Sequence, residues 1–252
     1  MTDKQSERQK KILEFVTREG RTEVTRLADL TGVSTVTLRK DLDILEEKGL
    51  IRHEKGQAAP GSSDDMNNRL SYHYDTKRKI ARIACGLVKD GEAVMIESGS
   101  CCAILAEELA LSRRDVRIIT NSAFIAAYIR RLPQAKIVLL GGDYQNEAQV
   151  MVGPIARICA RGFTVEKLFI GADGFSQETG FTGNDHNRSE TVRDMAKQAA
   201  QTIILTESEK FAKQGLVPLL PFGGISAVIT DGNIPPEKER FLAERGITVH
   251  KE

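Results

Sequence analysis

The chain has 252 residues, of which 40% are hydrophobic and 28% charged, and its formal net charge is +1. This composition is that of an ordinary folded, soluble protein. No run approaches the roughly 18 apolar residues of a membrane span. No apolar stretch follows the basic residues of the opening MTDKQSERQKK, as a secretory signal requires. We therefore expect a cytoplasmic protein without a membrane partner.

Cysteine spacing gives no sign of a metal centre or a disulfide framework. The cysteines are Cys85, Cys101, Cys102 and Cys159. None of them forms a C-x-x-C pair, so reduced thiols are expected. Asp185 beside His186 could ligate a metal, but two adjacent ligands do not make a site. We predict no metal site and no cofactor.

Net charge alone does not decide whether the protein binds DNA. The first 58 residues hold 12 Lys and Arg against 11 Asp and Glu. This near-neutral balance argues against a nonspecific DNA-binding protein. A prediction of DNA binding must therefore depend on where the charges lie.

The composition of the chain changes near residue 60. Residues 1–58 contain short amphipathic helical segments, and residues 59–68, APGSSDDMNN, have the composition of a linker. Short apolar runs then alternate with helical stretches such as CCAILAEELAL. The runs expected to be strands are 93–98, 116–122, 136–142, 167–174, 202–208, 227–231 and 247–251. This alternation predicts an α/β domain at 69–252 whose largely parallel sheet is covered on both faces.

Three helices are expected in the N-terminal domain. Ser6 can cap a first helix that runs to about residue 18, a second helix spans about 24–31, and Ser34 can cap a third that ends near residue 48. Ala28 allows the last two helices to cross closely, and Gly32 makes the tight turn between them. This spacing predicts a helix-turn-helix.

The third helix has two unlike faces. Leu38, Leu42 and Leu45 share a narrow arc and are expected in the core. Val36 lies on the opposite side near the helix N-terminus, where recognition helices meet base edges and a valine can contact a thymine methyl. The residues of this helix predicted to contact DNA are Ser34, Thr35, Val36, Thr37, Arg39 and Lys40.

The segment LIRHEKGQA after Gly49 is expected to form a strand, a basic turn and a return strand, which is a wing. Arg52, His53 and Lys55 would lie along the DNA backbone or in the minor groove. The alternative is a three-helix interaction module with solvated charges, because helix-turn-helix spacing also occurs by chance. The wing and the attached α/β domain favour DNA binding.

Small polar loops follow several predicted strands of the second domain. In an open α/β sheet, ligands bind beyond the carboxyl ends of the strands. The loop ESGSCC begins a helix whose free N–H groups suit a phosphate or carboxylate, and TNS offers hydroxyl and amide groups. The residues predicted to bind an effector are Glu97, Ser98, Gly99, Ser100, Cys101, Thr120, Asn121, Ser122, Gly141, Gly142, Gly171, Asp173, Thr182, Glu207 and Lys210.

Each of these features also has a purely structural explanation. Gly141 and Gly142 can form a simple turn, ESGSCC can merely cap a helix, and Lys210 can be solvated. Their convergence on one edge of the sheet is the argument for a joint site.

Taken in order, these motifs resemble the DeoR family of bacterial transcriptional regulators over essentially the whole chain. The motifs are GVSTVTLRKDLDILEEKGLIR, RLSYHYDTKRKIA with Arg69 and Lys77, IESGSC, TNS, LLGG, FIGADGFSQETGFT and SEKF. The resemblance implies a winged helix-turn-helix joined to a sensor domain similar to sugar-phosphate isomerases. Such regulators typically repress carbohydrate operons, bind a phosphorylated sugar and act as homodimers or homotetramers.

The chain departs from the family pattern at several positions. Glu97 and Glu207 stand where aspartate is usual, Val192 stands where lysine is frequent, and the wing has RHEKGQA in place of a Gly-Gly pair. The difference in the wing leaves its basic residues Arg52, His53 and Lys55 in place, and the other differences bear on which effector is bound.

The resemblance implies a DNA-binding repressor whose partners are a double-stranded operator and a phosphorylated sugar. The alternative from another class is a sugar-phosphate isomerase that carries a DNA-binding domain. Glu97, Asp173 or Glu207 could then serve as the carboxylate base that shuttles a proton between adjacent carbons.

Overall fold

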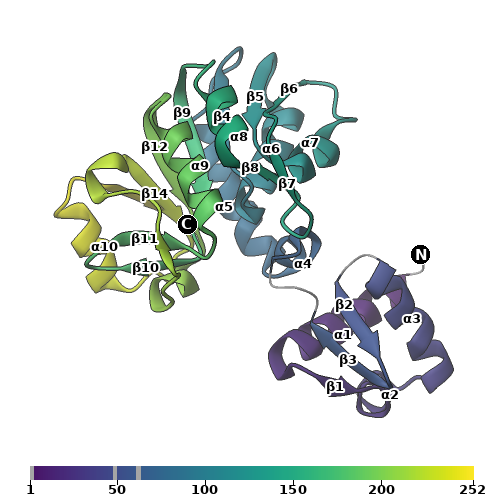
Figure 1. The fold of residues 1–252 in the computed structure, drawn as a ribbon. Coiled ribbons are helices and arrows are strands. Elements are labelled where there is room, and N and C mark those ends of the chain that lie inside the picture. The colour runs from purple at the N-terminus through teal and green to yellow at the C-terminus, as the bar shows by residue number, and fades with distance from the viewer. Residues whose placement is uncertain (1–2, 48–49, 61–63) are drawn as a thin grey trace. The chain divides into compact units, whose positions relative to one another are not determined.

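The computed structural model describes residues 3–47, 50–60 and 64–252, and the chain divides into two compact units after Tyr72 (Figure 1). The predicted boundaries were residue 58 and a linker at 59–68. Helix α4 (Met66–Ser71) includes the last three residues of that segment, and Asp65 caps it by accepting the N–H groups of Asn67 and Asn68. The polar composition of 64–68 therefore reflects a helix cap as well as a connection.

In the described part of the chain, the first unit contains three helices packed with a small sheet, and a short fourth helix follows them. Its elements are α1 (Asp3–Glu19), β1 (Thr22–Glu23), α2 (Val24–Thr31), α3 (Thr35–Glu47), β2 (Ile51–Glu54) and β3 (Gln57–Pro60), followed by α4. The strand order is β1-β3-β2, and all pairs are antiparallel. One expectation was wrong, because Ser6 lies inside α1 rather than before it. The short strand β1 was not predicted.

The core of the first unit joins all three helices to the wing. Leu38, Leu42 and Leu45 are buried, as the helical pattern predicted. They pack in one cluster with Ile12, Val16, Val24, Leu27, Ala28, Ile51 and Ala58. The recognition helix α3 is therefore held by apolar contacts on one face only.

A seven-stranded parallel sheet organises the second unit. Its strands are β4 (Ala93–Ile96), β5 (Val116–Thr120), β6 (Ala135–Leu139), β9 (Val165–Gly171), β12 (Ala199–Leu205), β14 (Ala227–Thr230) and β15 (Thr248–Lys251). Every one of them falls on or beside a run that the sequence predicted to be a strand. Their order is β15-β14-β12-β9-β4-β5-β6, and every pairing is parallel.

Helices cover both faces of this sheet (Figure 1). They are α5 (Tyr74–Gly86), α6 (Ser100–Ser112), α7 (Ala123–Ile129), α8 (Gly153–Ala160), α9 (His186–Ala196) and α10 (Pro236–Ala243), with two 3₁₀ turns, η1 (Ser208–Ala212) and η2 (Phe222–Gly224). Helices α5 and α6 lie on one face, and α8 and α9 lie on the other. Strands buried on both faces carry continuous apolar runs, as Leu168, Phe169 and Ile170 do in β9.

Two small antiparallel additions were not predicted. They are the hairpin of β7 (Asp143–Gln145) and β8 (Val150–Val152), and a three-stranded sheet of β10 (Gly174–Ser176), β11 (Gly180–Gly183) and β13 (Val217–Pro218). Strands of two to four residues give too short an alternation to stand out from loops.

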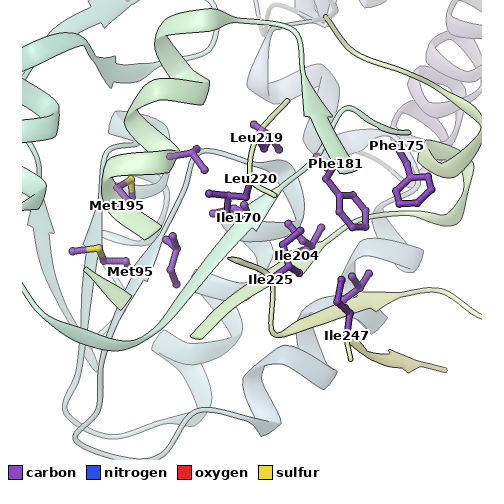
Figure 2. Packing of buried hydrophobic residues seen from close by; sticks show 14 of the residues in the cluster. Met95, Ile170, Phe175, Phe181, Met195, Ile204, Leu219, Leu220, Ile225 and Ile247 are labelled. Carbon is purple, nitrogen blue, oxygen red and sulfur yellow. The ribbon is translucent and has the colours of Figure 1, made fainter. Parts of the chain in front are cut away.

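One core cluster of the second unit lies on the face of the sheet under α8 and α9. Met95 of β4, Ile170 of β9 and Ile204 of β12 meet Met195 of α9, and Phe175 and Phe181 extend the cluster over the end of β12 (Figure 2). Within the described residues, none of the helices combines the length and the apolar character that crossing a bilayer demands.

Candidate functional site

The N-terminus of α3 has the geometry of a recognition helix. Gly32 adopts a left-handed φ of 66° at the end of α2, and its N–H donates to the carbonyl of Ala28. The hydroxyl of Ser34 accepts the N–H of Thr37 at 3.3 Å and contacts the Thr37 hydroxyl at 3.1 Å. The Ser34 hydroxyl therefore caps α3 and the Thr37 hydroxyl contacts that cap, while a DNA contact by either residue stays a prediction.

Most of the side chains predicted to contact DNA are exposed. Val36 is 65% exposed, although α3 buries its leucines. Thr35, Arg39 and Lys40 are also exposed. The structure thus brings an apolar contact and two cations together on the side of α3 that faces away from the core.

A buried carboxylate, which the sequence analysis did not single out, fixes α3 against α1. Asp41 is 1% exposed and accepts the Arg8 Nε at 2.5 Å and the side-chain amides of Gln5 and Gln9 at 3.3 Å each. The hydrogen bond from Arg8 to Asp41 also raises the pKa of that guanidinium. Asp41 follows Arg39 and Lys40 in the chain, so the contacts of Asp41 fix the part of α3 that carries both cations. Its partners on α1 lie more than 30 residues earlier in the chain.

The wing is a hairpin with a two-residue turn. Lys55 and Gly56 both have left-handed φ values, 50° and 77°, which is the geometry of a type I′ turn. Arg52 and Lys55 are exposed, as a DNA contact requires.

His53 differs from the other predicted wing contacts because it faces α3. The backbone N–H of His53 donates to Glu46 Oε1 at 2.7 Å, and the imidazole Nδ1 lies 3.9 Å from Asp43 Oδ1. One ligand-type atom from each of these three side chains falls within 4.8 Å of the others. We assign this group as a clamp that fixes the wing to the recognition helix, and a DNA contact by His53 stays a prediction.

The loops predicted to bind an effector lie where the strand order reverses. The chain passes from β4 to β5 and β6 on one side, and then returns to β9, β12 and β14 on the other side of β4. Glu97 follows β4, and its Oε2 accepts the N–H of Gly171 at 3.3 Å from the end of β9. A Cβ added to Gly99 would lie only 3.2 Å from the Gly171 Cα. The two loops can approach this closely because both positions are glycine.

Helix α6 begins at this point without a side-chain cap. Gly99 is its N-cap, and Ser100, Cys101 and Cys102 form its first turn. The Ser98 hydroxyl donates to Glu97 Oε1 at 2.6 Å, so this side chain and the Gly171 N–H already engage the carboxylate. The first N–H groups of a helix favour an anion, and this helix presents them at the switch point of the sheet.

The loop after β5 contributes one side chain with an unsatisfied acceptor. Thr120 Oγ1 accepts the Ser122 N–H, and Ser122 Oγ accepts the Ile125 N–H, so both hydroxyls stabilise the loop and α7. Asn121 is 1% exposed and donates its amide to the Met151 carbonyl at 3.1 Å. Its Oδ1 is buried without a hydrogen-bond partner. A buried acceptor of this kind is costly unless a ligand or water donates to it.

Other predicted effector residues have structural partners. A Cβ on Gly142 would lie 2.6 Å from the Val152 carbonyl, so this glycine permits close packing, and Gly141 precedes it on the surface. Thr182 is buried and accepts the Gly215 N–H, and Asp173 accepts the Asn184 N–H at 3.1 Å. Lys210 lies 3.4 Å from Glu209. Ligand binding by these residues stays a prediction.

The polar neighbours of Asp185 give it a structural role. Its Oδ1 caps α9 by accepting the Arg188 N–H at 2.8 Å, and its Oδ2 accepts the Gln145 amide at 3.1 Å. The side chain therefore joins the β7–β8 hairpin to the start of α9, while the adjacent His186 is exposed.

A buried ion pair lies beyond the end of β12. Lys77 Nζ donates to Glu207 Oε1 at 3.0 Å, and both side chains are almost fully buried. His73 Nδ1 lies 3.5 Å from the same oxygen. Both His73 and Lys77 belong to the motif RLSYHYDTKRKIA. The motif is rich in charged and polar residues, so its pattern offered no reason to place either side chain at the sheet.

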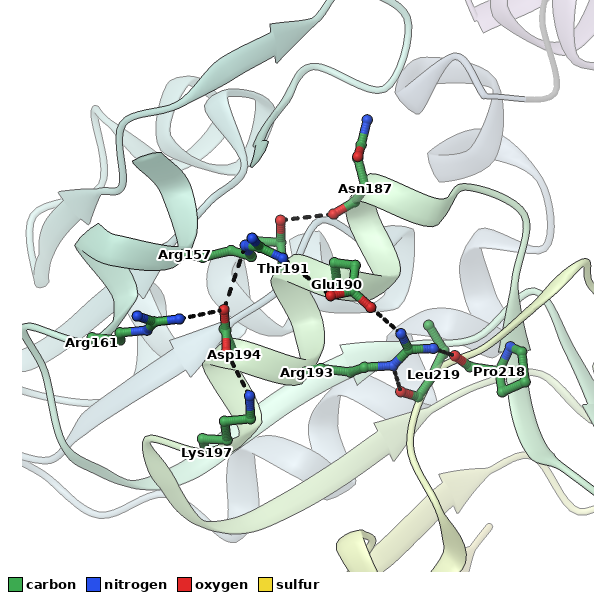
Figure 3. Close-up of polar contacts among 10 residues, drawn as sticks. All are labelled: Arg157, Arg161, Asn187, Glu190, Thr191, Arg193, Asp194, Lys197, Pro218 and Leu219. Carbon is green, nitrogen blue, oxygen red and sulfur yellow. Dashed lines mark hydrogen bonds and ion pairs between the residues drawn. The ribbon is translucent and has the colours of Figure 1, made fainter. Parts of the chain in front are cut away.

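A cluster of charges joins α8 to α9 away from the sheet edge (Figure 3). Asp194 accepts hydrogen bonds from Lys197 at 2.8 Å and Arg161 at 3.2 Å, and Arg157 lies 3.5 Å away. Burial opposes ionisation of this carboxylate, but the hydrogen bonds from Lys197 and Arg161 outweigh it, and the pKa of Asp194 falls below its ordinary value.

Two neighbours of this cluster complete the α9 contacts. Arg193 donates to the carbonyls of Pro218 and Leu219, and so holds β13 against α9. Val192 is buried in the core cluster under α8 and α9. The valine at this position therefore supports the sheet-facing side of α9.

A winged helix-turn-helix followed by an α/β unit with a switch-point site is the architecture of a DNA-binding regulator. Family models match both parts, the DeoR-like helix-turn-helix domain over residues 8–63 and the DeoR C-terminal sensor domain over residues 72–232. The chain belongs to the DeoR family of transcriptional regulators, and not to an enzyme family.

Relatives match this chain over almost its whole length. One relative comes from Escherichia coli O157:H7, and its name describes it as an aga operon transcriptional repressor. It is 27% identical to this chain, and the match covers 97% of this chain and 93% of the relative. The regulator IolR of Bacillus subtilis (strain 168) is 25% identical over 94% of this chain and 95% of its own. The transcriptional repressor AccR of Agrobacterium fabrum is 28% identical over 89% of each.

Solved structures resemble only part of the chain. Ribose 5-phosphate isomerase A of Methanocaldococcus jannaschii covers 54% of each chain with 20% identity and a TM-score of 0.40. The eIF2B β2δ2 complex of C. thermophilum covers 74% of this chain and 54% of its own, with 15% identity and a TM-score of 0.42.

Proposed function

We propose that this protein is a repressor of a carbohydrate operon and leaves its operator when a phosphorylated sugar binds the second unit. The observation that carries the proposal is the match of one chain to both the DNA-binding and the sensor model of the family. Two of the relatives are named as repressors.

The effector site we propose lies beyond β4, β5 and β9. The uncapped start of α6 supplies N–H groups for a phosphate. The buried Asn121 Oδ1 could accept from a sugar hydroxyl, which would satisfy an otherwise orphaned acceptor. Glu97 and Asp173 are acidic, so they would accept from hydroxyls rather than contact the phosphate.

The DNA-binding part is tested by a gel-shift titration with a duplex selected in vitro by the full chain. Arg39→Ala or Lys40→Ala should weaken binding several-fold. Each substitution should also reduce the slope of log affinity against log salt by about one if the side chain contacts one phosphate. Lys11→Ala is the matched control, since Lys11 is an exposed lysine on α1. Unchanged affinity in both variants, with no difference from the control, would refute this DNA-binding face.

The effector part is tested by thermal unfolding of the full chain with sugar phosphates, the matching free sugars and inorganic phosphate. A ligand at about 100 times its dissociation constant stabilises the folded state by about 2.7 kcal/mol. We expect stabilisation by a sugar phosphate at concentrations where its free sugar has no effect. Equal responses to the phosphorylated and free sugars would argue against a phosphate contact.

A further inference from the structure

Two opposite charges are buried together at the start of the second unit. Lys77 of α5 is 2% exposed, and its Nζ donates to the Glu207 carboxylate at 3.0 Å. Removing two charges from water has a large desolvation cost that pairing only partly offsets, so apolar residues of similar size would hold α5 against β12 at least as well. Packing alone therefore does not account for this pair.

The same carboxylate oxygen is shared with the residue that begins the unit. His73 Nδ1 lies 3.5 Å from Glu207 Oε1, and the His73 carbonyl accepts the Lys77 N–H at 3.1 Å. His73 has a φ of 50°, a left-handed conformation that costs a residue with a Cβ about 1–2 kcal/mol. Along the chain, Tyr72 directly before it is the last residue of the DNA-binding unit.

Glu207 also belongs to the edge of the sheet where the effector site is proposed. It follows β12 and is the N-cap of η1, whose Lys210 donates its N–H to the Glu207 carbonyl at 3.0 Å. Strand β12 pairs with β9, which ends at Gly171 beside Glu97. One carboxylate thus connects the edge of the sheet to the first residues of α5.

We propose that His73, Lys77 and Glu207 form a relay that carries effector binding from the sheet edge to the chain segment entering the DNA-binding unit. The proposal rests on the proposed function. With its phosphate at the start of α6, a sugar phosphate offers hydroxyls that donate to Glu207 in place of Lys77. This exchange favours a state in which the ion pair is open and His73 is released, and this state binds the operator less tightly.

The test is a double substitution that removes the pair without leaving one buried charge alone. Lys77→Met with Glu207→Gln should imitate the effector-bound state in the full chain and weaken binding to a duplex selected by the wild-type protein about tenfold. Hydrogen exchange should also accelerate at the first-turn amides of α5. The single variant His73→Asn, which tolerates a left-handed φ, should weaken binding in the same direction by less.

A second ion pair provides the matched control. Lys167 Nζ lies 2.6 Å from Glu92 Oε1, with 13% and 14% of the side chains exposed, at the opposite end of the strands. Lys167→Met with Glu92→Gln should leave operator affinity unchanged. Thermal unfolding of both double variants measures how much stability each pair supplies.

The outcomes separate the relay from the proposed function. If the wild-type chain selects no DNA sequence, the proposed function fails and the relay fails with it. If the wild-type chain binds but the Lys77/Glu207 variant binds equally well or more tightly, the relay is overturned and the proposed function stands. An equal decrease in affinity in both double variants also overturns the relay, because removal of any ion pair would then have the same effect.

Discussion

Packing in the core does not explain the position of Val36. It is 65% exposed on α3, while the leucines of the same helix are buried, so it adds almost nothing to the core. Its location one residue after the start of α3 suits a contact with a base edge in the major groove. The contacts of the Ser34 hydroxyl with the N–H and the hydroxyl of Thr37 fix the first turn of α3, which carries Val36.

Val36→Ala should alter sequence preference more than overall affinity. A contact with a thymine methyl is worth about 1 kcal/mol, so its removal corresponds to roughly a fivefold change in preference at one base pair. In vitro selection with both proteins measures this directly. A uniform decrease in affinity across all sequences, with the same preferred bases, would mean that Val36 does not contact a base.

At the scale of elements, the wing and the α8–α9 pair show how short segments are fixed. The turn of the wing places Lys55 at a left-handed φ of 50°, which favours asparagine or glycine over lysine. A lysine at this position therefore strains the backbone more than asparagine or glycine would. Such strain is expected where the charge of the side chain is needed for binding.

Lys55→Asn separates these two effects. Asparagine followed by glycine is the preferred pair for a type I′ turn, so the free energy of unfolding should stay the same or rise by a few tenths of a kcal/mol. Operator affinity should fall, with a salt slope shallower by about one. Melting curves and salt titrations measure the two quantities, and an unchanged slope would exclude a phosphate contact by Lys55.

Asp194 predicts a pH dependence of stability. Its folded-state pKa is below the ordinary 3.8 because hydrogen bonds from Lys197 and Arg161 outweigh the effect of burial. A depressed carboxylate pKa stabilises the folded state above the unfolded pKa, and this contribution is lost as pH falls through the folded pKa.

Asp194→Asn should therefore lower the free energy of unfolding by about 1–3 kcal/mol at neutral pH. The difference from the wild type should shrink as pH falls below about 4. Urea titrations across this range measure it. A difference that stays constant down to about pH 2 would show that packing, and not charge, is responsible.

For the whole molecule, the family match spans both units and gives the DNA-binding unit a partner sensor unit in the same chain. We expect a homodimer or homotetramer, because operators are usually bound with matching two-fold symmetry.

This expectation predicts the form of the operator. Two inverted half-sites should lie about 10–10.5 base pairs apart, or a multiple of that spacing. Footprinting of the selected duplex, with light scattering of the free protein, measures both. Protection of a single half-site by a monomer would contradict it.

Much of the architecture follows from local sequence. The seven main strands lie in runs of five to eight residues that are mostly apolar and β-branched, and the helix-turn-helix has a strict spacing of a small residue, a glycine and a leucine ladder. These features determine structure through neighbouring residues, so the sequence alone was sufficient to predict them. The short strands β1, β7 and β8 carry too few residues for that signal.

The partners of charged residues were decided only by the tertiary structure. Asp41 is buried because α1 brings Arg8 across it, and Lys77 is buried because α5 packs beside Glu207, 130 residues later in the chain. In the sequence each looks like an ordinary solvated charge. Long-range packing creates the low-dielectric surroundings in which these charges must pair, and no local pattern encodes it.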